Sequence, residues 1–221
     1  MKRKVLNAVV AAMALGLLMS LPAAADLYTA GPGLGIGITD NGYDGSLASM
    51  ASSYIIVPST GNDIIADVDV DLMMDHTWMG DLTIKLLGPD STLITLVSRP
   101  GFDEPADDGS SCCGESSDLS KLIPIHFDDS ALTSSEEMDA FSIGEGSTFY
   151  SSGFGTDHEL GLFNGLSQVG TWTLYVGDGA VADIGTIDAW ALNITPVPVP
   201  GAALLGILGF GAVGIKLRKF V

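Results

Sequence analysis

Residues 75–90 read DHTWMGDLTIKLLGPD, and this stretch decides the fold. Polar and apolar residues alternate along its DLTIKLL segment, as in a β-strand that turns one face to the core. The residues GPDS then favour a turn, and TLITLV (92–97) continues as a second strand, so the pattern predicts a β-hairpin. The stretch also raises a question, because His76 and Asp81 beside a turn could belong to a catalytic site or to a structural corner.

Three further segments show the same period of two. Residues 66–74, ADVDVDLMM, place three aspartates on one face of a strand and apolar side chains on the other. Calcium loops also space aspartates in this way, but they need a glycine where this chain has Leu72, so a half-buried strand is favoured. Residues 171–178 and 184–195 are also expected strands, and the GAVAD loop between them predicts another hairpin.

No sustained helical periodicity is found outside the two ends of the sequence. The repeated short strands therefore predict an all-β protein with a β-sandwich in residues 61–195, into which residues 26–60 lead. Trp172 and Trp190 follow the strand alternation and are expected in the core. Residues 99–122 are polar and rich in Gly, Ser and Asp, so they are expected to form an extended surface loop.

Residues 1–25 have the organisation of a secretory signal peptide. Three basic residues near the start precede an apolar run that reaches Leu21. The small residues Ala23 and Ala25 favour cleavage after Ala25. An uncleaved N-terminal anchor is the alternative, although the run is short for a membrane span.

Residues 196–221 contain a second expected targeting element. The chain is apolar from Gly201 to Ile215, and with the preceding Pro-Val residues it reaches about 20 residues, the length of a transmembrane helix. The basic sequence KLRKFV follows, which predicts a cytoplasmic tail and a body on the outer side of the membrane.

The body carries a large negative charge. All 27 acidic residues lie between the two targeting segments, together with only three of the nine basic ones, so the net charge there is 3 − 27 = −24. This charge argues against a surface for nucleic acid or anionic lipid, which needs clustered Lys and Arg. It favours divalent cations as counter-charges.

The two cysteines, Cys112 and Cys113, are adjacent. Neighbouring Cα atoms lie about 3.8 Å apart, below the usual range for a disulfide, so a bridge between them would be strained. Free thiols and an intermolecular bridge remain open in an oxidising compartment.

Five aspartates at expected strand ends are candidate ligands for calcium: Asp81, Asp128, Asp129, Asp178 and Asp183. Calcium takes several hard oxygen ligands, often from neighbouring loops. The hypothesis is that Asp128 and Asp129 share one calcium site with Asp178 or Asp183. Solvated loop charges are the alternative, and for Asp81 the alternative is a hydrogen-bonded corner.

The segments HTWMGDLTIKLLGPDSTLITLVSRPG (76–101), FDDSA (127–131) and GTWTLYVGDGAVADIGTIDAWALNI (170–194) occur in this order. Together they resemble the P domain, also called the Homo B domain, of proprotein convertases of the kexin and furin kind. The resemblance covers about residues 61–195 and implies an eight-stranded jelly-roll β-sandwich. It also implies a module that stabilises a subtilisin-like catalytic domain and cleaves no bond itself.

The sequence does not predict an enzyme. A subtilisin-like triad needs a Ser nucleophile, a His base and an Asp on a large α/β scaffold. The chain has three histidines but no Gly-Thr-Ser-x-Ala stretch, and the body is too short to hold that scaffold beside a sandwich. No catalytic residues are assigned.

The C-terminal residues resemble a PEP-CTERM sorting signal. The motif is formed by Val197, Pro198 and Pro200, ahead of the apolar segment and the basic tail, with Val199 where glutamate is typical. The resemblance implies processing by an exosortase-type enzyme, from the periplasmic side of the inner membrane to the cell surface or matrix. A plain single-pass anchor is the alternative.

Three functions follow as hypotheses. The first is a non-catalytic exported surface or matrix module for protein interaction or adhesion. The second is an accessory domain that binds or stabilises a separate subtilisin-like serine endopeptidase. The third is the binding of a carbohydrate or another surface polymer.

Overall fold

The computed structural model describes residues 24–198 except residues 103–105, 108, 110–113, 141 and 144–146. These residues belong almost wholly to one compact unit, Ala25–Pro196. The predictions on Ala23, the cysteine pair, Pro200 and the C-terminal helix lie outside the described residues. Within the described part of the chain, no helix is long and apolar enough to cross a membrane.

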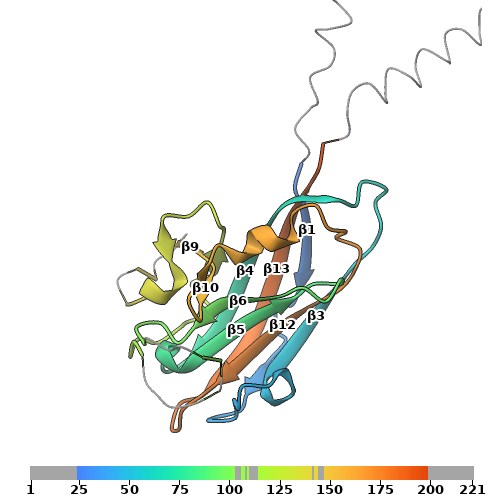
Figure 1. The fold of residues 1–221 in the computed structure, drawn as a ribbon. Coiled ribbons are helices and arrows are strands. Elements are labelled where there is room, and N and C mark those ends of the chain that lie inside the picture. The colour runs from blue at the N-terminus through green and yellow to red at the C-terminus, as the bar shows by residue number, and fades with distance from the viewer. Residues whose placement is uncertain are drawn as a thin grey trace, which may run out of the picture. The chain divides into compact units, whose positions relative to one another are not determined.

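Two large β-sheets form the body (Figure 1). One sheet has seven strands, in the order β1-β13-β4-β7-β9-β8 with β2 also paired to β13, and the other has four strands, in the order β3-β12-β5-β6. A separate two-stranded ribbon is formed by β10 and β11. The strands are β1 (Asp26–Ala30), β2 (Ile36–Ile38), β3 (Ala51–Val57), β4 (Ile65–His76), β5 (Leu82–Leu87), β6 (Leu93–Ser98), β7 (Ile125–Phe127), β8 (Thr133–Ser134), β9 (Thr148–Tyr150), β10 (Ser152–Gly153), β11 (Thr156–Asp157), β12 (Gly170–Asp178) and β13 (Gly185–Pro196).

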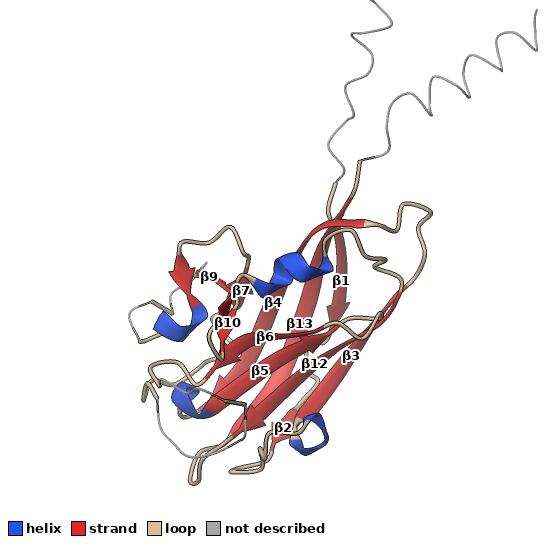
Figure 2. Cartoon of the chain, in the orientation of Figure 1, coloured by secondary structure: helices blue, strands red, loops and turns tan. Residues whose placement is uncertain are grey.

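Helical structure in the described residues is limited to short 3-10 turns, as the colouring of Figure 2 shows. These are η1 (Leu47–Ser49), η2 (Met79–Asp81), η3 (Ser135–Glu137) and η4 (Glu159–Phe163). The predicted all-β class is therefore confirmed. Residues 26–60, expected to lead into the sandwich, supply β1, β2 and β3.

The core lies between the two large sheets and follows from the alternation of the sequence. In β4, Val68, Val70 and Leu72 are buried, while the aspartates between them point outward, as predicted. Trp172 and Trp190 are buried in the same core, also as predicted. The indole N–H of Trp190 donates to the Ser53 hydroxyl at 3.0 Å and so links a strand of each sheet.

One predicted hairpin is present and the other is wrong. β5 and β6 pair as a hairpin, closed by a hydrogen bond from Gly88 N to Thr92 O of 2.8 Å. β12 and β13 do not pair, because β12 lies between β3 and β5 whereas β13 lies between β1 and β4. Their short connection passes from one sheet to the other. Two strands show the same alternation whether they pair as a hairpin or lie in different sheets, so the pattern could not tell these cases apart.

The loop expected between residues 99 and 122 is not simply an exposed one. Gly80 N donates to Glu115 O at 2.9 Å, and Gly114 N donates to Gly80 O at 3.1 Å, so the loop packs against η2. The side chains of Lys85 and Arg99 are buried in this region. Lys85 forms an ion pair with Asp107 of the loop, and burial lowers the pKa of its ammonium group.

Each of these strands pairs with another strand inside residues 26–196. A fragment of this length therefore keeps all the described strand pairs and the core between them. Its two ends lie together, because β1 and β13 are antiparallel neighbours and Asp26 stands opposite Ile194.

Candidate functional site

The strongest candidate site is the corner formed where β4, η2 and β12 end. His76 is the last residue of β4, Asp81 ends η2, and Asp178 ends β12. Each of these three side chains is only 1% exposed. Two carboxyl groups and an imidazole are therefore shielded together from water, which is costly unless they are paired.

His76 and Asp178 are paired. His76 Nε2 lies 3.3 Å from Asp178 Oδ2, and Nδ1 lies 2.8 Å from the carbonyl oxygen of Trp78. The other carboxylate oxygen of Asp178 accepts a hydrogen bond of 2.9 Å from Ala180 N, which turns the chain after β12. His76 is thus held at a structural corner by Asp178 and by the backbone of Trp78, whose N–H lies 3.2 Å from Nδ1.

Asp81 is the unpaired member of the corner. Its Oδ1 atom is buried and has no hydrogen-bond partner among the residues that the structure describes. Burial, and then the negative charges of Asp178 and Asp183, raise the pKa of Asp81 to about 6, against smaller opposite effects of His76 and Arg99. A cation beside Asp81 would stabilise its charged carboxylate, which burial and the neighbouring negative charges destabilise.

Asp183 ties the corner to β13. Its Oδ1 accepts a hydrogen bond of 2.8 Å from the Thr77 hydroxyl, and the same hydroxyl oxygen accepts one of 3.1 Å from Ile184 N. Asp183 is thus already engaged by the chain.

Asp128 and Asp129 lie in a different part of the molecule. β7 pairs with β4 so that Phe127 stands opposite Val70, and Asp128 follows there. Six residues of strand, or about 20 Å, separate Val70 from His76 at the corner. The expected calcium site that combined both groups of aspartates is therefore wrong, because the length of β4 separates them.

Both of these aspartates organise their own loops. Asp128 accepts hydrogen bonds from the backbone N–H and the hydroxyl of Ser130, at 2.7 and 2.8 Å. Asp129 accepts from the Ser151 hydroxyl and from Gly161 N, each at 2.9 Å. Nowhere in residues 24–198, the undescribed positions aside, do three or more His, Cys, Asp or Glu side chains form a group that could hold a metal.

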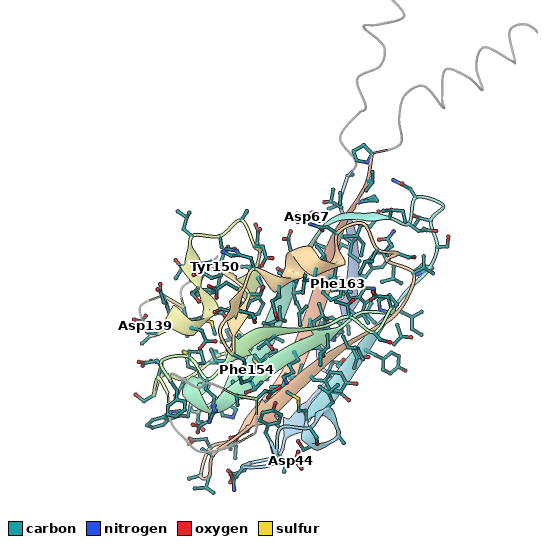
Figure 3. All side chains as sticks on the ribbon, viewed as in Figure 1. Asp44, Asp67, Asp139, Tyr150, Phe154 and Phe163 are labelled. Carbon is teal, nitrogen blue, oxygen red and sulfur yellow. The ribbon has the colours of Figure 1, made fainter. Side chains whose placement is uncertain are left out.

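The outer face of β4 carries the row of aspartates predicted from the sequence. Burial, and then the charges of Asp67 and Asp128, raise the pKa of Asp69 to about 7. Asp71 has partners: His126 Nδ1 lies 2.5 Å from its Oδ1, and the Asn193 side-chain amide donates to its Oδ2 at 2.9 Å. Figure 3 labels Asp67, which begins this row.

Two partly buried acids beside β6 were not predicted from the sequence. Glu159 accepts a hydrogen bond of 2.8 Å from Thr95 N, and Glu136 accepts one of 2.9 Å from Ser98 N. Burial, followed by the charge of Asp157, raises the pKa of Glu136 to about 8. Both carboxyl groups come from segments far from β6 in the sequence, so no local pattern could have found them.

A family model described as the proprotein convertase P-domain matches residues 65–111. The match includes β4, the corner sequence HTWMGDL and the β5–β6 hairpin. The resemblance drawn from the sequence extended further, to the strand that ends at Thr195. No curated protein matches the chain.

The solved structures that the chain matches include two of Aeromonas sobria proteins. The serine protease of that organism is 16% identical, with 80% of this chain covered and a TM-score of 0.43. Its complex with the chaperone ORF2 gives 17% identity, 85% coverage and a TM-score of 0.45. The chain spans 28% and 29% of the length of these two matched chains. An exo-beta-agarase is 11% identical, with 82% of this chain and 23% of that chain covered and a TM-score of 0.32.

Three residues of the expected targeting motifs lie at the ends of the described body. Ala25 precedes β1, and Val197 and Pro198 follow β13. Signal cleavage and exosortase processing stay predictions.

Proposed function

We propose that this protein is a non-catalytic accessory domain of the P-domain kind, with jelly-roll topology, that binds and stabilises a separate subtilisin-like serine endopeptidase. The observation that carries the proposal is the family match over residues 65–111, which includes the His76–Asp81 corner. The geometry of the corner agrees with a supporting role, because His76 is paired with Asp178 and main-chain atoms.

In the part of the chain that the structure describes, no serine hydroxyl is hydrogen-bonded to a histidine ring. The three histidines of the chain are all described, and their partners are Trp78, Asp178, Asp71, Asp129 and the ring of Tyr150. A serine nucleophile needs a base within hydrogen-bond reach, and none of these partners is a serine hydroxyl.

The test is co-purification of the tagged chain from its native cells, followed by labelling of the eluate with a fluorophosphonate probe for active serine hydrolases. We expect one labelled subtilisin-like protease whose activity survives heating longer when the chain is added back. A Gly80→Ala variant, expected to be unstable, serves as the control for a folded body. An eluate without a labelled protease, or a protease indifferent to the added chain, contradicts the proposal.

Export, surface sorting and a role in adhesion rest on the sequence alone. We propose that the N-terminal segment directs export and that Val197, Pro198 and Pro200 belong to a sorting signal. A mass spectrum of the mature protein tests both, because cleavage after Ala25 and near the Pro-Val residues gives defined masses.

The calcium hypothesis is kept in a narrower form, with Asp81 and Asp178 as the protein carboxylates of the site. Calcium is expected to raise the unfolding temperature of residues 26–196 in EDTA-treated buffer, because a ligand that binds only the folded state stabilises it. Asp81→Asn should abolish this shift, whereas Asp128→Asn should leave it intact. Differential scanning calorimetry across a calcium titration, with sodium chloride as the ionic-strength control, makes the measurement. No shift, or its loss in the Asp128 variant alone, removes the hypothesis.

A further inference from the structure

The strand β3 forms one edge of the four-stranded sheet (Figures 1 and 2). It pairs with β12 over its whole length, from Ala51 opposite Val176 to Val57 opposite Gly170. On its other side, no backbone hydrogen bond joins β3 to any described residue. An edge strand with free N–H and C=O groups is a template for a further strand.

The opposite edge of the same sheet is closed. The carboxyl groups of Glu159 and Glu136 accept hydrogen bonds from Thr95 N and Ser98 N of β6, as a neighbouring strand would. Side chains that occupy an edge in this way prevent another chain from pairing there. No described side chain binds the free backbone groups of β3 in this way. One edge of the sheet is therefore blocked, and the other is open.

The exposed side chains of β3 carry no charge. Tyr54 is 65% exposed and Ile56 is 66% exposed, and both point away from the core. Thr173 and Thr171 of β12 stand beside them. The strand reads ASSYIIV, without one charged residue in a body of net charge −24.

This lack of charge helps to decide which chain could pair with the free edge of β3. A second copy of the chain brings many carboxylates to any contact, and rows such as Asp67, Asp69 and Asp71 on β4 would repel each other. Two antiparallel β3 strands meet without placing any carboxylate in the paired segment. A two-fold axis at Tyr54 would set the two Tyr54 rings together and each Ile56 against Ser52 of the other copy, which is a self-complementary arrangement.

We propose that two copies of this protein associate through antiparallel pairing of β3, which joins their four-stranded sheets into one continuous sheet. The proposal does not depend on the protease partner. Because the body of each copy carries a charge of −24, the remaining surfaces of the two bodies repel each other, and salt screens this repulsion. Association should therefore strengthen as salt is added.

Sedimentation velocity of residues 26–196 at 50 and 500 mM NaCl tests the proposal. We expect a monomer–dimer equilibrium whose dissociation constant falls at high salt. Tyr54→Asp should raise that constant at least tenfold, because it sets two carboxylates against each other at the axis. Leu27→Asp is the matched control, since Leu27 is 61% exposed on β1 of the other sheet. A monomer at both salt concentrations, or a dimer weakened only by Leu27→Asp, overturns the proposal.

Crosslinking gives a second readout. In a background with both native cysteines replaced by serine, Tyr54→Cys should form a covalent dimer on oxidation, because paired residues near the axis lie within disulfide reach. Thr173→Cys, one strand further in, should not. Equal crosslinking of the two variants contradicts the assigned edge.

Discussion

Acidification from pH 8 to pH 5 is expected to stabilise the folded body. Among the described carboxyl groups whose pKa is raised in the folded state, three are shifted most: Asp81 to about 6, Asp69 to about 7 and Glu136 to about 8. Burial is the first cause in each case. In the unfolded chain the same groups titrate near pH 4.

The sign follows from the protons bound in each state. Between pH 4 and pH 8 the folded protein holds protons on these groups that the unfolded chain has released, so stability falls as pH rises. Each unit of pKa corresponds to about 1.4 kcal/mol, but Asp69 is partly exposed and solvent screens it. We expect about 2–4 kcal/mol for the three groups together.

Chemical denaturation of residues 26–196 at pH 5, 6.5 and 8 measures this effect. Glu136→Gln keeps an acceptor for Ser98 N and removes the titration, so it should flatten the profile and stabilise the protein at pH 8. Glu137→Gln is the control, because the neighbouring Glu137 is exposed and should leave the slope unchanged. A body that gains stability toward pH 8 shows that these carboxyl groups are not protonated in the folded state.

Gly80→Ala is expected to destabilise the folded body strongly, because it adds a methyl group where the corner has no room for one. A Cβ at this position would lie 2.3 Å from Glu115 N and from the carbonyl carbon of Gly114. Both are backbone atoms, so the loop that crosses η2 must move and lose its hydrogen bonds to Gly80. We expect a loss of about 3 kcal/mol or more, and a fall of roughly 6–12 °C in the unfolding temperature.

The control is Gly37→Ala in β2. A Cβ there has no atom within 4 Å, and Gly37 is exposed, so the same change of residue should leave the unfolding temperature almost unaltered. Calorimetry of both variants separates the close approach at Gly80 from the general effect of replacing a glycine. Similar unfolding temperatures for the two variants contradict the packing of the loop on η2.

The sequence predicted what depends on local alternation. The outward aspartates of β4, the buried tryptophans and the β5–β6 hairpin all follow from a period of two, which is set by the backbone itself. It failed at the connection between β12 and β13, because alternation does not say which sheet a strand joins. Alternation also says nothing of the close approach of Gly114 and Glu115 to Gly80, because that contact joins segments distant in the sequence.

Part of the candidate site was likewise predicted from the sequence, and part could not be. Asp81 and Asp178 were selected as strand-end carboxylates, and the structure brings them together at one corner. The contact of Asp178 with His76 spans 102 positions in the sequence. The carboxyl groups that accept from Thr95 N and Ser98 N of β6 come from segments 64 and 38 positions away. Such pairs are made by the sheet topology, so spacing along the chain carries no trace of them.

The antiparallel pairing of β1 with β13 has a practical consequence. Asp26 stands opposite Ile194, so the first and last residues of the body lie at the same end of the sandwich. The His76 corner stands opposite Gly185, at the far end of the 12-residue strand β13 and thus about 30 Å from those two residues. Residues 26–196 can therefore be inserted into a loop of a carrier protein, or attached to a support by either end. In both cases the His76 corner stays away from the point of attachment.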